Sequence, residues 1–299
     1  MGFRSQVARS TLADANESRD WRIYADFAQV LIRIARPLYA RDPIGVDLDQ
    51  SLYALDSTTI DLCLSLFPWA KFRRHKAAVK MHTLLDLRGN IPTFIRITDG
   101  KTHDVNILDE FLPEPGACYV MDRAYVDFER LFVFTLCSSF FVVRTKKNIL
   151  LQRRYSHPVD KSTGVRSDQT VLLTAIESAL AYPDPLRRIS YFDAETNKRF
   201  KFLTNNFALP ALTIARIYKS RWQIELFFKE LKSTLGFAQY SFQKFSAVEA
   251  WAETTIMTVL FLEHERAKRL RDRRLSEESR RWWASQRLHG LCLAFRQEC

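Results

Sequence analysis

Apolar residues recur at helical spacing near the start of the chain and again towards its end. Residues 11–40 place apolar side chains three or four positions apart after a Thr-x-x-Asp start, which is typical of a capped amphipathic helix. A long helical pattern covers residues 209–235, and a second, apolar first and basic at its end, covers 247–275. The tail at 280–295 predicts a further short helix. Both ends of the chain are therefore expected to be helical.

Between these ends the pattern changes to short β-like runs with helical runs among them. The apolar runs predict strands at 51–62, 76–89, 90–100, 116–125 and 140–147. A Gly-Asn pair separates the second run from the third and indicates a hairpin. Helices are predicted at 103–112 and 126–139. This order predicts an α/β fold in which a mixed five-stranded sheet is flanked by helices.

A third pattern fills the stretch before the long helix. Short strands separated by Pro, Asp and Asn turns are predicted at 170–176, 186–193 and 198–204. We interpret this stretch as a small β-rich insertion. The expected organisation is a helical N-terminal region, the first part of the core, the insertion, the core helix and a helical, basic C-terminal region, at 1–45, 46–148, 149–206, 207–240 and 241–299.

The charge balance favours a polyanionic partner. The chain has 45 Lys and Arg against 34 Asp and Glu, a formal charge of +11 and a pI of about 9.5. Such an excess is typical of proteins that bind nucleic acid, although a merely basic globular protein fits it equally well. Five scattered cysteines without a CxxC pair argue against a disulfide framework or a zinc ribbon. No secretory signal or membrane-spanning run is evident, so we expect a cytoplasmic protein with no membrane partner.

Two aspartates, Asp56 and Asp122, each close an apolar strand-like run. Ligands of open α/β sheets gather beyond the carboxyl ends of strands, where two neighbouring carboxylates could share Mg²⁺ or Mn²⁺. The alternative is that each only forms a turn, which is the commoner role of a single Asp. Similarly placed aspartates are Asp61, Asp86, Asp99, Asp104 and Asp127. His82 and His103 have no neighbouring ligand spacing, and we interpret them as structural histidines.

A second polar set lies on the long predicted helix. On a wheel of 100° per residue, Tyr218, Arg221, Glu225 and Lys232 fall within a sector of about 60° that borders the apolar face. A carboxylate between cations could hold a metal while the cations bind phosphates. Ordinary ion pairing along a solvated helix is the alternative. The residues expected in the core are Ile217, Trp222, Ile224, Phe227, Phe228, Leu231 and Leu235.

The spacing Tyr-x2-Arg-x3-Glu-x6-Lys resembles the YREK signature of DDE transposases of insertion-sequence family four. The segments LDSTTIDL around Asp56 and VMDRAYVDF around Asp122 resemble that family's two aspartate segments. The resemblance implies an RNase H-like core with a β-rich insertion before the last catalytic helix. It also implies that Asp56, Asp122 and Glu225 are catalytic and bind two Mg²⁺ (or Mn²⁺) ions.

The same resemblance implies a reaction. Double-stranded DNA would be cut at the terminal inverted repeats of a bacterial insertion sequence and joined to target DNA. Tyr218, Arg221 and Lys232 would grip the DNA, a homodimer would hold two element ends, and the protein would associate with the nucleoid. The basic run at 71–80 is expected to follow DNA phosphates, with a solvated loop as the alternative. The basic residues taken from this run are Arg73, Arg74 and Lys76.

Two other functions fit the same residues. One is an RNase H-like nuclease without strand transfer, and the other is an inactive DNA-binding remnant. The second arises because relatives of this kind carry a DNA-binding segment ahead of the stretch at which this chain starts, so residues 1–45 are expected to be a truncated DNA-binding part. Metal-dependent cleavage separates the remnant from the enzymes, and strand transfer separates the transposase from the nuclease.

Overall fold

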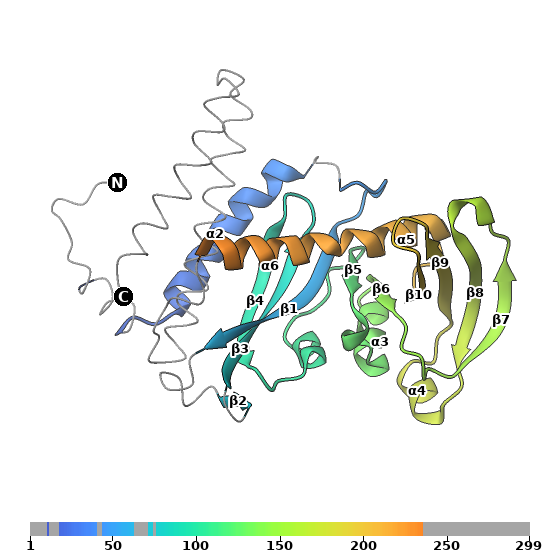
Figure 1. Cartoon of the computed structure of the whole chain (residues 1–299), viewed down its shortest axis with the longest axis horizontal. Coiled ribbons are helices and arrows are strands. Elements are labelled where there is room, and N and C mark those ends of the chain that lie inside the picture. Colours follow the sequence, from blue (N-terminus) through green and yellow to red (C-terminus); the bar gives the residue numbers. More distant parts are fainter. Residues whose placement is uncertain (1–10, 12–17, 41–43, 63–70, 74–75, 236–299) are drawn as a thin grey trace, which may run out of the picture.

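The structure is a computed structural model that describes residues 11, 18–40, 44–62, 71–73 and 76–235. Within these residues, ten strands form one mixed sheet flanked by helices (Figure 1). The sequence predicts a mixed sheet flanked by helices, but with five strands. The strands are β1 (Leu52–Leu62), β2 (Lys71–Arg73), β3 (Lys76–Asp86), β4 (Ile91–Asp99), β5 (Cys118–Met121), β6 (Phe140–Arg144), β7 (Leu151–His157), β8 (Val165–Leu173), β9 (Leu186–Asp193) and β10 (Lys198–Thr204). The helices are α2 (Arg22–Tyr39), α3 (Phe128–Leu136), α4 (Ile176–Ala181), α5 (Ala211–Ser220), α6 (Trp222–Leu235) and the short 3₁₀ helices η2 (Asp104–Asp109), η3 (Arg123–Tyr125) and η4 (Lys161–Thr163).

The five predicted core strands lie side by side in the order β4-β3-β1-β5-β6. β3 is antiparallel to both β1 and β4, whereas β1, β5 and β6 run parallel. The parallel pairs need crossovers, and α3 supplies the one between β5 and β6. This is the arrangement expected of an RNase H-like core. The segment predicted as a helix at 103–112 contains only the six-residue 3₁₀ helix η2.

The predicted hairpin joins β3 to β4 through Gly89 and Asn90, whose φ angles are both positive, at 82° and 53°. Two successive positive φ angles are what a tight hairpin turn requires. A Cβ atom on Gly89 would lie 2.4 Å from Cγ of Tyr39, because the end of α2 closes over this turn. Pro92 stands beside a bulge in β4, an edge strand where its missing N–H leaves no ladder bond broken.

The described part of the predicted N-terminal helix is α2, which packs on β4. It buries Ala28, Ile32, Ala35 and Tyr39, a helical spacing that gives one apolar face. Arg36 ties the helix to the core through an ion pair with Asp86 at 3.2 Å. The predicted capping start runs into residues 12–17, which lie outside the described residues.

The β-rich insertion continues the core sheet. Its strands run antiparallel in the order β10-β9-β8-β7, and β10 pairs with core strand β6. The sequence predicts the insertion but gives no sign of this junction. It also misses β7, since LQRRYSH is exposed and polar along most of its length and shows no apolar alternation.

Two apolar clusters cover the two faces of the sheet. Ala54, Val120 and Val142 belong to the cluster under α5 and α6, whereas their chain neighbours Leu55 and Met121 belong to the cluster under α3. Side chains alternate between the faces of a strand. The residues two positions beyond the first three therefore point towards α5 and α6, and they are Asp56, Asp122 and Arg144.

The long helix predicted at 209–235 is present as two helices interrupted only at Arg221, whose own backbone is helical at φ −53° and ψ −27°. α5 ends at Ser220, α6 begins at Trp222, and Arg221 forms the turn between them (Figure 1). The core prediction is confirmed for Ile217, Ile224, Phe227, Phe228 and Leu231. It is wrong for Trp222, which is 58% exposed because it lies about 40° from Tyr218 on the wheel, away from the apolar face. The side chain of Leu235 lies outside the described part.

The helices predicted at 247–275 and 280–295 fall outside the described residues. Among those described, no helix is long and apolar enough to cross a membrane.

Candidate active site

The parallel pairing of β1 and β5 places the two predicted aspartates side by side. The ladder ends at the pair Leu55 and Met121, and the next residue on each chain is Asp56 or Asp122. β5 stops here and turns into η3, while β1 continues, paired with β3. Asp122 therefore follows a strand end as predicted, but Asp56 lies within β1. The sheet opens between the two strands at this level, on the face covered by α5 and α6.

The break between α5 and α6 brings three more predicted residues to the same place. The Arg221 guanidinium donates to Asp56 Oδ2 at 2.6 Å and also pairs with Glu225. The Tyr218 hydroxyl donates to Asp122 Oδ1 at 3.3 Å. Residues separated by more than 90 positions thus form one polar cluster, which we call the acid cluster: Asp56, Asp122, Tyr218, Arg221 and Glu225.

Burial and mutual repulsion shape the charge of Asp56. Its side chain is 22% exposed, and burial raises the pKa of its carboxyl to about 6. Arg221 and the Ser57 N–H act in the opposite direction, while the negative charges of Asp122 and Glu225 add to the rise in pKa. The three carboxylates are close enough to influence one another, which is the electrostatic situation that a cation relieves.

The donor set suits a hard divalent cation, since it consists of three carboxylates. As the side chains stand, however, the described residues contain no group of three or more His, Cys, Asp or Glu close enough to hold one metal ion. The Arg221 guanidinium contacts both Asp56 and Glu225 and offsets part of their negative charge. The residue types therefore fit a metal site, and a positive charge already stands between two of them.

The other predicted DNA-binding residues lie further along β1. Lys232 donates to the Thr59 carbonyl at 2.9 Å, three residues beyond Asp56. Arg73 and Lys76 are paired across β2 and β3, near the far end of the β1–β3 ladder. That end is six residues from Asp56, or about 20 Å at 3.3 Å per residue. Arg74 lies outside the described residues.

A half-buried polar network beside the acid cluster centres on Asp104, which the sequence offered only as one of several similarly placed aspartates. Asp104 accepts from Ser57 Oγ at 2.8 Å and from Lys80 Nζ at 3.1 Å. His82 is fully buried, bonds Thr98 and lies 3.9 Å from Asp104. Burial lowers the pKa of His82 to about 4, so it is a neutral structural residue as predicted. The signal for Asp104 was only its place after a strand, which it shares with several purely structural aspartates.

Those other aspartates have local roles. Asp86 accepts from the Arg88 N–H at 2.9 Å and also pairs with Arg36, Asp99 accepts from the Lys101 and Thr102 N–H groups, and Asp127 caps α3. The alternative of a turn or cap residue was therefore correct for these three. What separates Asp56 and Asp122 from them is a pair of cationic or hydroxyl partners from the α5–α6 break.

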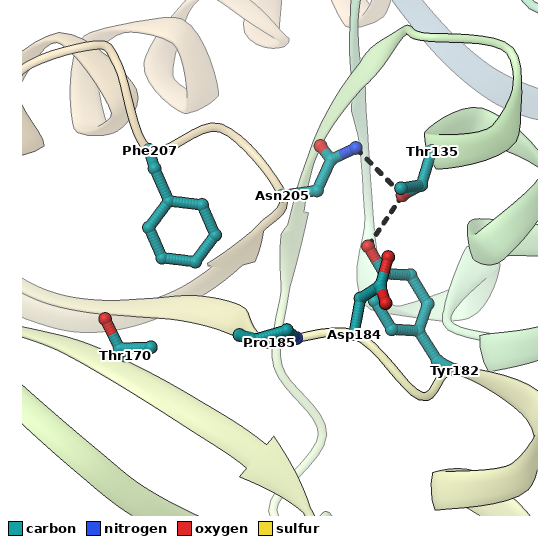
Figure 2. Close-up of a pocket in the computed structure, with 7 residues that line it drawn as sticks. All are labelled: Thr135, Thr170, Tyr182, Asp184, Pro185, Asn205 and Phe207. Atoms are coloured by element: carbon teal, nitrogen blue, oxygen red, sulfur yellow. Dashed lines mark hydrogen bonds between the residues drawn. The ribbon is translucent and has the colours of Figure 1, made fainter.

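A cavity of about 410 Å³ lies away from the acid cluster, where α3 and α4 meet the insertion (Figure 2). The Thr135 and Tyr182 hydroxyls share a hydrogen bond of 2.7 Å, and Thr135 Oγ1 also accepts from Asn205 Nδ2 at 3.0 Å. These hydrogen bonds join the insertion to α3. We assign the cavity no ligand.

Comparison with known proteins identifies the family of the chain. The family described as "Transposase DDE domain" matches residues 47–261, most of the chain. The chain belongs to this family. Its members generally depend on divalent metal ions. The matched range includes Asp56, Asp122 and Glu225 and leaves out most of the N-terminal region.

Two relatives are named as transposases. One is y4zB of Sinorhizobium fredii, 32% identical over 228 residues, which are 75% of this chain and 62% of that protein. The other is named for insertion sequence element IS5377 of Geobacillus stearothermophilus, 32% identical over 187 residues, which are 62% of this chain and 49% of that protein. The chain thus spans between half and two thirds of these relatives. A solved piggyBac transposase synaptic complex with hairpin DNA aligns with a TM-score of 0.45 at 7% identity, over 77% of this chain and 50% of that one.

Proposed function

We propose that this DDE-family chain is the transposase of a bacterial insertion sequence. It cuts double-stranded DNA at the terminal inverted repeats of the element and joins the freed end to target DNA. The observation that carries the proposal is that Asp56 and Glu225 share the Arg221 guanidinium, while Asp122, the residue after β5, lies beside Asp56 on the same face of an RNase H-like sheet. The family and the relatives' names support the reaction class.

In this proposal the three carboxylates hold two Mg²⁺ or Mn²⁺ ions. When bound, such ions lower the pKa of water and stabilise the leaving oxygen of a phosphodiester. The chain itself supplies the positions. Arg221 must release Asp56 and Glu225 for these to bind a cation, and it is then free to donate to a DNA phosphate. Tyr218 holds Asp122 in place through its hydroxyl.

The DNA path proposed here follows β1. Lys232 at Thr59 and the paired residues Arg73 and Lys76 of β2 and β3 follow the acid cluster along the β1–β3 ladder. Together they would span about 20 Å, or roughly six base pairs of a duplex. The homodimer that pairs two element ends and the association with the bacterial nucleoid, in the cytoplasm, belong to this same proposal.

The deciding experiment is cleavage of a duplex that carries the inverted repeat flanking this gene, with Mg²⁺, by the full chain and by Glu225→Gln. We expect the substitution to lower the rate by about two to four orders of magnitude, because it removes a metal-binding charge. Glu230→Gln is the matched control, since Glu230 is exposed on the same helix and should leave the rate unchanged. Equal rates for the wild type and Glu225→Gln would refute the assignment.

A second arm separates the transposase from a nuclease on the same core. A duplex already cut at the repeat, with a free 3′-OH, is offered together with a supercoiled plasmid. The transposase joins the two, and a nuclease only nicks the plasmid. A chain that binds the repeat but neither cuts nor joins it would be the inactive remnant.

A further inference from the structure

Arg144 occupies a place in the sheet equivalent to those of the two aspartates. β5 and β6 pair in parallel up to Met121 and Val143, just as β1 and β5 pair up to Leu55 and Met121. The next residues on the three neighbouring strands are therefore Asp56, Asp122 and Arg144. All three point towards α5 and α6, since each follows a residue of the apolar cluster on that face by two positions.

A group of aromatic rings holds the Arg144 side chain. Its guanidinium carbon lies 5.3 Å from the ring centre of Phe200. Phe200 stacks on Phe202, and Phe202 packs on Tyr218 with ring centres 4.7 Å apart. The hydroxyl of that tyrosine donates to Asp122. One aromatic platform thus fixes both a partner of Asp122 and the Arg144 guanidinium.

Arg144 lacks the carboxylate partner that several other buried or half-buried arginines have. Arg36, Arg187 and Arg221 each pair with at least one carboxylate. Arg88 donates to backbone carbonyls and Arg188 to the Gln169 side chain, so these two have hydrogen-bond acceptors that Arg144 lacks. In the part of the chain that the structure describes, Arg144 forms no ion pair and no side-chain hydrogen bond. A guanidinium keeps its charge under all ordinary conditions and offers five N–H donors, so this one has its donors available for an anion.

We propose that Arg144 is a further DNA-binding residue of the acid cluster, which donates to a backbone phosphate of the strand that Asp122 faces. The inference rests on the proposed function, because a phosphate arrives at this place only if DNA is the substrate. Arg144 fixes the strand by charge and by the planar geometry of its donors, with no base contact. It acts on the side of Asp122 away from Asp56, where the described residues place no other cation of the predicted set.

The competing explanation is purely structural, with Arg144 merely stacked on Phe200. Arg166 provides the matched control, because its guanidinium carbon lies 5.2 Å from the Phe192 ring centre, on a strand three places away from β6 in the sheet. Arg166→Ala removes the same kind of stacking without touching the acid cluster. Arg144→Lys keeps the charge but loses the planar donor fork.

The test is a double-mutant-type cycle, in which the Arg144 side chain and single DNA phosphates are altered separately and together. Affinities for the repeat duplex are measured without Mg²⁺, so that no strand is cut, using DNA in which one phosphate at a time near the cleaved bond is a neutral methylphosphonate. The wild type should bind about 10–100-fold more weakly when the phosphate at one particular position is made neutral, which is the range expected for a hydrogen bond to a charged group. Arg144→Ala should lose as much on unmodified DNA, show no further loss at that position, and lower the salt slope by about one.

Arg144→Lys should fall between the wild type and Arg144→Ala, and Arg166→Ala should keep the full sensitivity at the same phosphate. Thermal melting of each variant shows whether it is folded. If folded Arg144→Ala binds as the wild type does, or still loses affinity at every modified position, the proposal is wrong while the proposed function stands. If the wild type neither binds nor cuts the repeat duplex, the proposed function fails and this inference fails with it.

Discussion

Asp56 carries a charge that destabilises the folded protein. Its carboxyl is mostly buried, and the negative charges of Asp122 and Glu225 oppose its ionisation, while Arg221 compensates only in part. Destabilising charges of this kind are typical of binding sites, and a bound cation would offset the negative charge of Asp56. The sequence indicated the three carboxylates through their motif segments. It could not indicate the place of Arg221 between two of them, because that contact joins residues 165 positions apart.

The pKa of Asp56 sets the pH dependence of its effect on stability. A carboxyl whose pKa rises from 3.8 to about 6 on folding contributes stability that is present below pH 4 and lost as the pH rises through 6. Asp56→Asn keeps the shape without the charge. We therefore expect Asp56→Asn to raise the free energy of unfolding above pH 6 by up to roughly 3 kcal/mol in the absence of metal. At pH 4 the substitution should leave the free energy of unfolding unchanged.

Asp99→Asn should change the stability in the opposite direction and serves as the control. Hydrogen bonds from the Lys101 and Thr102 backbone lower the pKa of the Asp99 carboxyl, so removing its charge should destabilise the protein at neutral pH. Denaturant unfolding at pH 4 and pH 7.5 measures both variants. A destabilised Asp56→Asn at pH 7.5 would mean that the ion pair with Arg221 outweighs burial and repulsion.

At the scale of elements, the α5–α6 break determines the site more than either helix does. A wheel for one continuous helix correctly placed Tyr218, Arg221 and Glu225 at the border of the buried face. It could not show that the helix stops at Ser220, because the sequence KSRWQ has no Pro or Gly to end a helix. α5 lies on β5, β6, β8 and β9, whereas α6 lies on β1. Arg221 lies between the two helices, and its guanidinium donates to Asp56.

The contact between α2 and the β3–β4 turn can be tested at Gly89. Ala at this position has to adopt a φ of 82° and place its Cβ 2.4 Å from the Tyr39 ring. We expect Gly89→Ala to cost about 2–4 kcal/mol, part from the backbone strain and part from displacing α2. Gly116→Ala isolates the first part, since Gly116 has a φ of 78° and nothing within 4 Å of its added Cβ. Equal losses of stability for the two variants would mean that α2 does not press on the turn.

At the scale of the whole molecule, the sheet is continuous from β4 to β7 (Figure 1). Periodicity predicted the core strands, the hairpin and the existence of the insertion, because these follow from local alternation and turn residues. It did not predict that β10 pairs with β6, a long-range choice that depends on which edge of the core is free. The consequence is that Phe200 and Phe202, residues of the insertion, reach the acid cluster and support Tyr218 and Arg144.

A continuous sheet predicts that the insertion and the core unfold together, and Asn205 is the place to test it. Its side chain accepts from the Phe141 N–H at 3.0 Å and donates to Thr135 and to the Ser139 carbonyl at 3.0 and 2.9 Å. Asn205→Ala leaves a buried N–H and a carbonyl unpaired and should cost about 2–4 kcal/mol. If the whole described sheet is one cooperative unit, the slowest-exchanging amides of β9 and of β1 should lose the same free energy of protection.

The matched control for this variant is Gln169→Ala, which removes a bond to Arg188 between two insertion strands and leaves the junction with the core intact. We expect it to cost less than about 1 kcal/mol, since both side chains are half-exposed. Hydrogen exchange then separates two architectures. If Asn205→Ala lowers protection in β9 while β1 keeps its full protection, the insertion is an independent folding unit that only abuts β6. Equal losses in both strands mean that the aromatic platform of the insertion is as rigid as the core strands that carry Asp56 and Asp122, which is what positioning Arg144 beside them requires.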